Sequence, residues 1–132
     1  MSALTYPKWV WADVPLITID YLRPLLSVPV FTVVPAIRPA SFVRVQRVGG
    51  VASGPIDSAR ILLECWAATE AAAAALVAIV REHMRAMRGT LSGFMVAGPS
   101  ESGGPASIAD PIAGLPRYLL TVVVPVRANP GT

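Results

Sequence analysis

The chain has 132 residues, the usual size of one domain, and 54% of them are hydrophobic, which excludes the polar composition typical of disordered chains. Only 14% of the residues are charged, against about 25% in a typical soluble domain, so we expect much of the surface to be apolar and to have partners. The net charge is +3, and ten of the eleven cations are arginines, which are enriched at protein interfaces. A GC-rich genome would produce the same arginine bias through its codons.

The sequence predicts neither a membrane span nor a targeting signal. A span needs about 20 consecutive apolar residues, and the apolar runs are interrupted by prolines at 24, 29 and 35 and by Glu70. Residues 1–15 lack the apolar core of a signal peptide. The single Cys65 cannot form an intramolecular disulfide, so we expect a buried thiol in a reducing compartment.

The first predicted elements are an N-terminal arm over residues 1–12 and a short helix. Asp13 can cap the helix in "DVPLITIDYLRPLL", and Pro24 makes continuation past Arg23 unfavourable. The segment "SVPVFTVVPAIRPASF" that follows is β-branched but interrupted by prolines, which favours a strand that is bent or at a sheet edge.

The stretch "SFVRVQRV" alternates as a strand does, with Val43 and Val45 on one face. Arg44 lies on the other face with Phe42 and Gln46, whereas Arg47 falls on the valine face by strict alternation. Arg47 must therefore leave that face at the strand end or through a bulge. We expect the two glycines that follow, Gly49 and Gly50, to end the strand in a turn or bulge.

A second strand is predicted in "ARILLECWA", with Ile61, Leu63 and Cys65 on one face. Its other face is mixed and includes Glu64, whose partner we expect to be Arg60 or Arg117 because an unpaired buried acid is costly.

The clearest element is a long helix from Glu70 to Arg88, with Thr69 as its N-cap and Gly89 as its stop. Arg81, Arg85 and Arg88 share its outer face. The stripe that should face a sheet consists of Leu76, Val80, Met84 and Met87, widened by Val77 and Ile79.

The C-terminal part is predicted to hold a short strand in "GTLSGFMVAG", a long loop over residues 98–115, and a strand from Arg117 to Val126 buried on both faces. Residues 128–132 read as a loose tail. The fold class that follows is α+β, a single small domain over residues 13–127 in which a mixed or antiparallel β-sheet packs against the long helix and the short N-terminal helix.

No catalytic, metal or cofactor site is predicted. His83 is the only histidine, so with one cysteine a zinc site cannot be assembled from His and Cys. The glycine pairs are not followed by Lys-Ser/Thr, which excludes a phosphate-binding loop of that kind. We therefore expect a protein that is not an enzyme.

A nucleic-acid reader usually shows a basic stripe with aromatic platforms. Here the cations are dispersed and the aromatics do not alternate with them. The isoelectric point of about 9.6 and the arginine face of the long helix keep a small DNA-binding domain as an alternative.

The order and spacing of several segments resemble the tail terminator proteins of long-tailed (siphovirus) bacteriophages, especially those of actinobacteria. The segments are "RPASFVRVQRVGG", a strand ending "ECWA", an Ala-rich helix, and "DPIAGLPRYLLTVVVPVR", and the resemblance covers residues 13–127. It implies a structural virion protein, assembled in the host cytoplasm, that forms a hexameric ring at the head–tail junction. The ring caps the tail tube, ends its polymerisation and joins the tail to the head.

The partners that the resemblance implies are further copies of the chain, the major tail tube protein and the head-completion or connector proteins, with DNA passing through the lumen unread. A head-closure or connector protein of the same neck is the alternative within this class. For each candidate interface residue, a solvated surface or local turn chemistry is the competing interpretation. The candidates are Trp9, Trp11, Arg44, Arg47, Gly49, Gly50, Glu101, Asp110 and Arg117.

Overall fold

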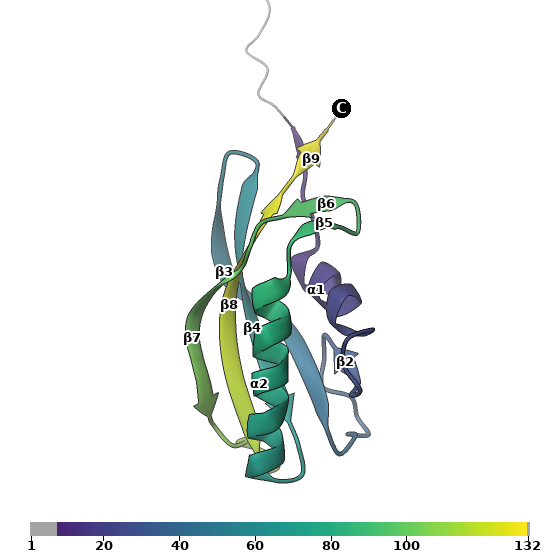
Figure 1. Cartoon of the computed structure of the whole chain (residues 1–132), viewed down its shortest axis with the longest axis vertical. Coiled ribbons are helices and arrows are strands. Elements are labelled where there is room, and N and C mark those ends of the chain that lie inside the picture. The colour runs from purple at the N-terminus through teal and green to yellow at the C-terminus, as the bar shows by residue number, and fades with distance from the viewer. Residues whose placement is uncertain (1–7, 132) are drawn as a thin grey trace, which may run out of the picture.

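Three long antiparallel strands form the centre of the molecule, and two helices lie on one face of the sheet (Figure 1). The computed structural model describes residues 8–131. The elements in chain order are β1 (Trp9–Val10), α1 (Val14–Leu22), β2 (Val30–Phe31), β3 (Phe42–Ser53), β4 (Ile56–Trp66), α2 (Glu70–Ala86), β5 (Gly89–Leu91), β6 (Phe94–Val96), β7 (Ser100–Ser107), β8 (Arg117–Arg127) and β9 (Asn129–Pro130). The predicted α+β class is confirmed.

The larger sheet has the order β2-β3-β4-β8-β6-β5, and β7 also pairs with β8. The sheet is mixed because β2 runs parallel to β3 whereas the other pairings are antiparallel. The helix α1 packs against β2 and β3, and α2 packs against β4, β7 and β8. The hydroxyl of Tyr21 joins the two helices by donating to the carbonyl of His83 at 2.6 Å.

The core lies between the helices and the sheet. Alternate residues of β3, β4 and β8 point into it, as the period-2 pattern of β3 and β4 predicts. The fully buried members from these strands are Val43, Val45, Ala59, Ile61, Leu63, Cys65, Leu120 and Val124. Burial, with a smaller contribution from the neighbouring Glu64, raises the pKa of the Cys65 thiol to about 12.

Both helices begin where the sequence predicts. The carboxylate of Asp13 accepts the amide of Leu16 at 3.2 Å, and the hydroxyl of Thr69 accepts the amide of Ala72 at 3.1 Å. The end of α2 was predicted at Arg88, but the helix ends at Ala86 because Met87 is already extended.

The sheet-facing stripe of α2 is buried as predicted, with one exception. Ile79 is 52% exposed. One residue is about 100° of helical rotation, so Ile79 points sideways from Val80, which is fully buried at the centre of the contact.

The bulge predicted at Gly49 and Gly50 is confirmed, but the prediction that the strand ends there is wrong, because β3 continues through them to Ser53. The register shifts between Arg47 and Gly49, which is a β-bulge. Gly50 has φ +111°, and a Cβ there would lie 2.2 Å from the carbonyl oxygen of Ser58. The glycines therefore carry the strand through a bulge close to β4.

The predicted loop 98–115 is a strand over much of its length, since β7 pairs antiparallel with β8. Its Gly, Pro and Ser composition gives no strand periodicity, and the pairing has register shifts around Gly103. Residues 108–115 remain a loop.

The tail at residues 128–132 is not loose in its described part. Asn129 and Pro130 pair with Val10 and Trp9, and Ala128 is buried. The predicted short strand around Gly93 is a hairpin of two strands, β5 and β6. The prediction that residues 117–126 are buried on both faces is half wrong, because the residues on the face away from the helices are only half-buried.

Candidate subunit interface

The face of the sheet opposite the helices is covered by no helix of the described chain; we call it the open face (Figure 1). Strand register places successive rows across it, such as Arg44, Glu64 and Leu119, and then Gln46, Leu62 and Thr121. Leucines and valines on this face keep part of their surface in solvent. The half-buried or exposed apolar members are Val51, Ile56, Leu62, Leu119, Val123 and Pro125.

Charge is distributed unequally between the two sides of the molecule. By register and alternation the strands of the open face present one carboxylate, Glu64, against four guanidiniums, those of Arg44, Arg60, Arg117 and Arg127. The helices and the residues that flank them carry Asp13, Asp20, Glu70 and Glu82 against Arg23, Arg81, Arg85 and Arg88. The positive charge of the protein is therefore concentrated on the open face.

Two of the predicted interface residues, Arg44 and Arg117, meet at Glu64. Each guanidinium places an Nη1 atom 3.2 Å from a different oxygen of this buried carboxylate. Arg117 also donates to the carbonyl of Ile108 at 3.0 Å, and Arg44 to that of Thr32 at 3.3 Å. The pair with Arg117 was expected, whereas Arg60 lies instead beside Gly49, whose Cβ position is 3.8 Å from its Nη1.

The indole of Trp66 lies next to this cluster. It stacks on Phe42 with ring centroids 4.6 Å apart, and the guanidinium carbons of Arg117 and Arg38 lie 5.5 Å and 6.0 Å from its centroid. Its Nε1 is buried and has no hydrogen-bond partner among the described residues. The stacking and cation–π contacts thus hold Trp66 through its faces.

Asp110 connects this cluster to the loop 108–115. Its buried carboxylate pairs with Arg38 and accepts the backbone amides of Ile112 at 2.9 Å and Ala113 at 3.4 Å. The bond from Arg38, helped by that from Ile112, lowers the pKa of Asp110 to about 2. The two isoleucines beside this pair, Ile37 and Ile112, are 90% and 89% exposed. The ion pair is therefore flanked by two apolar side chains that are exposed to solvent.

The prediction that Arg47 leaves the valine face is wrong, because Arg47 pairs in register with the core residue Ile61 and the register shifts only after it. Its guanidinium makes a bidentate pair with Asp57 at 2.6 and 2.7 Å and donates to the carbonyl of Gly49 at 3.1 Å. The bond to Asp57 raises the pKa of Arg47. Arg47 thus links β3 to the start of β4, near the hairpin turn, within its own chain.

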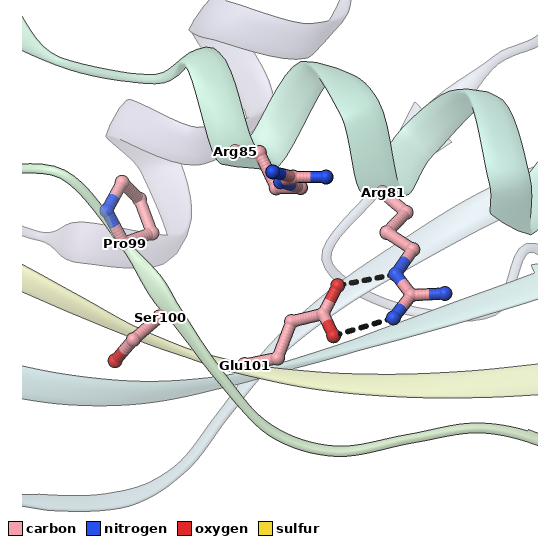
Figure 2. Close-up of a pocket in the computed structure, with 5 residues that line it drawn as sticks. All are labelled: Arg81, Arg85, Pro99, Ser100 and Glu101. Carbon is pink, nitrogen blue, oxygen red and sulfur yellow. Dashed lines mark hydrogen bonds and ion pairs between the residues drawn. The ribbon is translucent and has the colours of Figure 1, made fainter.

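Glu101 lies on β7 and faces α2 across an open pocket of about 300 Å³ (Figure 2). The carboxylate and Arg81 form a bidentate pair, with Nη2 and Oε2 2.8 Å apart, and this bond lowers the pKa of Glu101. Arg85, Pro99 and Ser100 complete the lining. Because Arg81 belongs to α2, its ion pair with Glu101 attaches β7 to this helix.

The two N-terminal tryptophans lie apart from these clusters. Trp9 is half-buried in the β1–β9 pair, and Trp11 is 45% exposed before α1. Among the described residues no group of three His, Cys, Asp or Glu side chains could hold a metal ion, and no helix is long and apolar enough to cross a membrane.

The structure thus gathers Arg44, Arg117 and Asp110 into one cluster with Glu64, Trp66 and Arg38, and leaves the other candidates separate. Sequence reasoning missed Arg38 and Trp66 as members. The sequence offered two signals for them. One is an arginine that stands between apolar residues in "AIRPA", and the other is an apolar strand that ends in "ECWA". No protein-family model matches the chain, and a search of curated proteins finds no significant match.

Proposed function

We propose that this chain is a structural subunit of the tail terminator type, which assembles with copies of itself into a ring, a hexamer by the resemblance. The observation that carries the proposal is the pair of unlike faces on opposite sides of the molecule. One is an open sheet face with apolar side chains and excess arginine, and the other is a helix layer with balanced charge. A subunit of a ring needs two different complementary surfaces, because its contacts are heterologous.

The exposed apolar side chains support the same proposal. Ile37, Ile112, Val33 and Val51 are each at least 67% exposed, and the first two flank the Arg38–Asp110 pair. Exposed apolar side chains that gather on one surface are typical of a surface that another protein covers. In the proposed ring they would contact the major tail tube protein or a head-completion protein at the head–tail junction. The ring would be a virion component assembled in the host cytoplasm, without catalysis and without reading the DNA in its lumen.

Measurement of the molar mass of the purified chain by sedimentation, alone and with tail tubes, tests the proposal. We expect a closed ring in solution or on tube ends, visible in electron micrographs. A chain that stays monomeric under both conditions and is absent from particles would contradict it. The position of the ring in a particle distinguishes a terminator, directly on the tube, from a head-closure or connector protein one layer nearer the portal.

A DNA-binding role is the second candidate, and the exposed Arg60 and Arg127 on the open face favour it. Binding of this kind would be independent of sequence and would weaken steeply with salt. A gel-shift titration with duplex DNA at low salt, where we expect no binding, separates the two candidates.

A further inference from the structure

We propose that the outer face of α1 in one copy of this chain docks on the open face of the next copy, near the turn of the β3–β4 hairpin. This inference rests on the proposed function, because it names the two surfaces that a head-to-tail ring would join. The surface on the sheet, which we call the hairpin-end patch, consists of Val51, Arg60, Met95, Val123, Pro125 and Arg127.

The hairpin-end patch combines exposed apolar side chains with two available cations. Val51 is 75% exposed and Met95 53% exposed, and register places them on the face that Arg60 and Arg127 share. Among the described residues neither guanidinium has an ion-pair partner, whereas Arg44 and Arg117 on the same face are both held by Glu64. The patch therefore has two cations for which a partner can supply carboxylates.

The surface on α1, which we call the α1 stripe, consists of Asp13, Leu16 and Asp20. Spacings of three and four residues put them on one side of the helix. All three are exposed, Leu16 by 50%, while Ile17 and Leu22 are buried in the core. Asp20 forms no ion pair among the described residues, and Asp13 caps the helix with one oxygen. The stripe thus presents carboxylate, leucine and carboxylate in sequence.

The two surfaces match in spacing. Seven residues of helix separate the carboxylates by about 10 Å along the axis. Arg127 pairs with Ile56, four residues from Arg60 on β4, which separates the two arginines by about 14 Å. Arginine side chains span the difference, and Leu16 then meets Val51, Val123 and Pro125 between them. Carboxylate lies opposite guanidinium, and leucine lies opposite the valines and proline.

The two surfaces also lie on opposite sides of the molecule. The helix α1 packs on one face of the sheet (Figure 1). Its exposed stripe lies on the side of the helix opposite the buried Ile17 and Leu22, and so faces away from the sheet. The hairpin-end patch lies on the other face of the sheet. A copy docked in this way offers its own patch to a third copy. The contact is heterologous and propagates until a rotation closes it into a ring.

Charge-reversed variants of the full chain test the contact. The patch variant is Arg60→Glu with Arg127→Glu, and the stripe variant is Leu16→Glu with Asp20→Arg, which keeps the helix cap at Asp13. We expect each variant alone to lose all species above the monomer in sedimentation, because each has one broken surface. An equimolar mixture should form heterodimers and nothing larger, since only the intact stripe of one can meet the intact patch of the other.

Two controls reverse the same number of charges on α2. Arg85→Glu with Arg88→Glu is the control for the patch variant, and Glu82→Arg is the control for the stripe variant. Both controls should assemble as the unmodified chain does. If a charge-reversed variant fails to fold, Arg60→Gln with Arg127→Gln removes the cations more gently and should still shift assembly to higher protein concentration.

Three results would overturn the contact. Variants that assemble like the unmodified chain show that the ring uses other surfaces, and leave the proposed function intact. A patch variant that assembles normally but loses binding to DNA or to an acidic protein assigns the patch to that partner. An unmodified chain that stays monomeric, alone and with tail tubes, contradicts both the contact and the proposed function.

Discussion

Glu64 shows how a single buried carboxylate organises one end of the open face. Its two oxygens accept from different strands, Arg44 on β3 and Arg117 on β8, so the acid ties three neighbouring strands together through side chains. With Asp110 and Arg38 nearby, two carboxylates face three guanidiniums, so the cluster carries a net charge of +1. Removal of the acid leaves two partly buried arginines close together without a carboxylate between them.

Substitution Glu64→Leu should therefore destabilise the fold by about 2–3 kcal/mol. Breaking a fully buried ion pair costs about 3–5 kcal/mol, and the side chain of Arg44 keeps 27% of its surface exposed, which reduces the penalty. Urea unfolding of both chains measures the difference in the free energy of unfolding. The matched control Glu82→Leu, whose side chain is 70% exposed, should change it by less than about 0.5 kcal/mol.

The Asp110–Arg38 pair should make the free energy of unfolding decrease as the solution becomes acidic. The folded pKa of Asp110, about 2, lies below its ordinary value of 3.8, so the folded state favours the ionised form. The resulting stabilisation is present above the unfolded pKa and is lost as the pH falls through the folded pKa. We expect the free energy of unfolding to decrease between pH 5 and pH 2, and Asp110→Asn to flatten this decrease. An unchanged pH profile in that variant would show that other carboxylates cause the loss.

At the scale of elements, the parts of the fold that the sequence predicts are those whose side chains alternate or repeat. The strands β3 and β4 and the helix α2 each bury a regular set of apolar residues, and their faces follow from period alone. The strands β7 and β9 were missed because neither has an alternating pattern of apolar side chains. Ser, Gly and Pro in β7 give no side-chain pattern, and β9 is a two-residue strand whose partner, Trp9–Val10, lies at the other end of the chain.

The bulge at Gly49 and Gly50 shows why the glycines were misinterpreted. A glycine pair after an alternating segment usually ends a strand. Here the pair lies within a strand, and the close approach of the Ser58 carbonyl makes a glycine necessary at Gly50. Position in the sheet, which the sequence does not reveal, decides between the two.

Substitution Gly50→Ala tests this interpretation. The Cβ would lie 2.2 Å from a backbone oxygen at a positive φ, so we expect a loss of about 2–4 kcal/mol in the free energy of unfolding from clash and strain together. Gly54→Ala is the matched control, since φ is +55° there but no atom lies within 4 Å of the added Cβ. That variant should lose only about 1–2 kcal/mol. Equal losses in the two variants would mean that the bulge relaxes away from β4.

At the scale of the whole molecule, the candidate site was only partly predictable because it depends on which side of the sheet the helices cover. Composition indicates an apolar surface, and the alternation puts Arg44 opposite the valines, but neither shows that the second face stays open. To know this, one needs the order of the strands in the sheet, in which β8 lies beside β4 and brings Arg117 to Glu64. Arg47 and Glu101, by contrast, are held within the chain by Asp57 and Arg81.

Cys65 should report on the opening of the whole sheet. Its thiol is fully buried on β4, between β3 and β8, and burial raises its pKa to about 12, so almost no thiolate exists at neutral pH. Fraying of the hairpin or of β7 leaves the thiol covered, and labelling then requires global unfolding. For a stability of at least 5 kcal/mol, labelling by an aromatic disulfide should be roughly a thousandfold or more slower in the native chain than in the unfolded chain.

Ser53→Cys in a Cys65→Ala background, at the exposed end of β3, should label at nearly the unfolded rate. Rapid labelling of native Cys65 would instead show that β4 separates from its neighbours while the rest of the molecule stays folded.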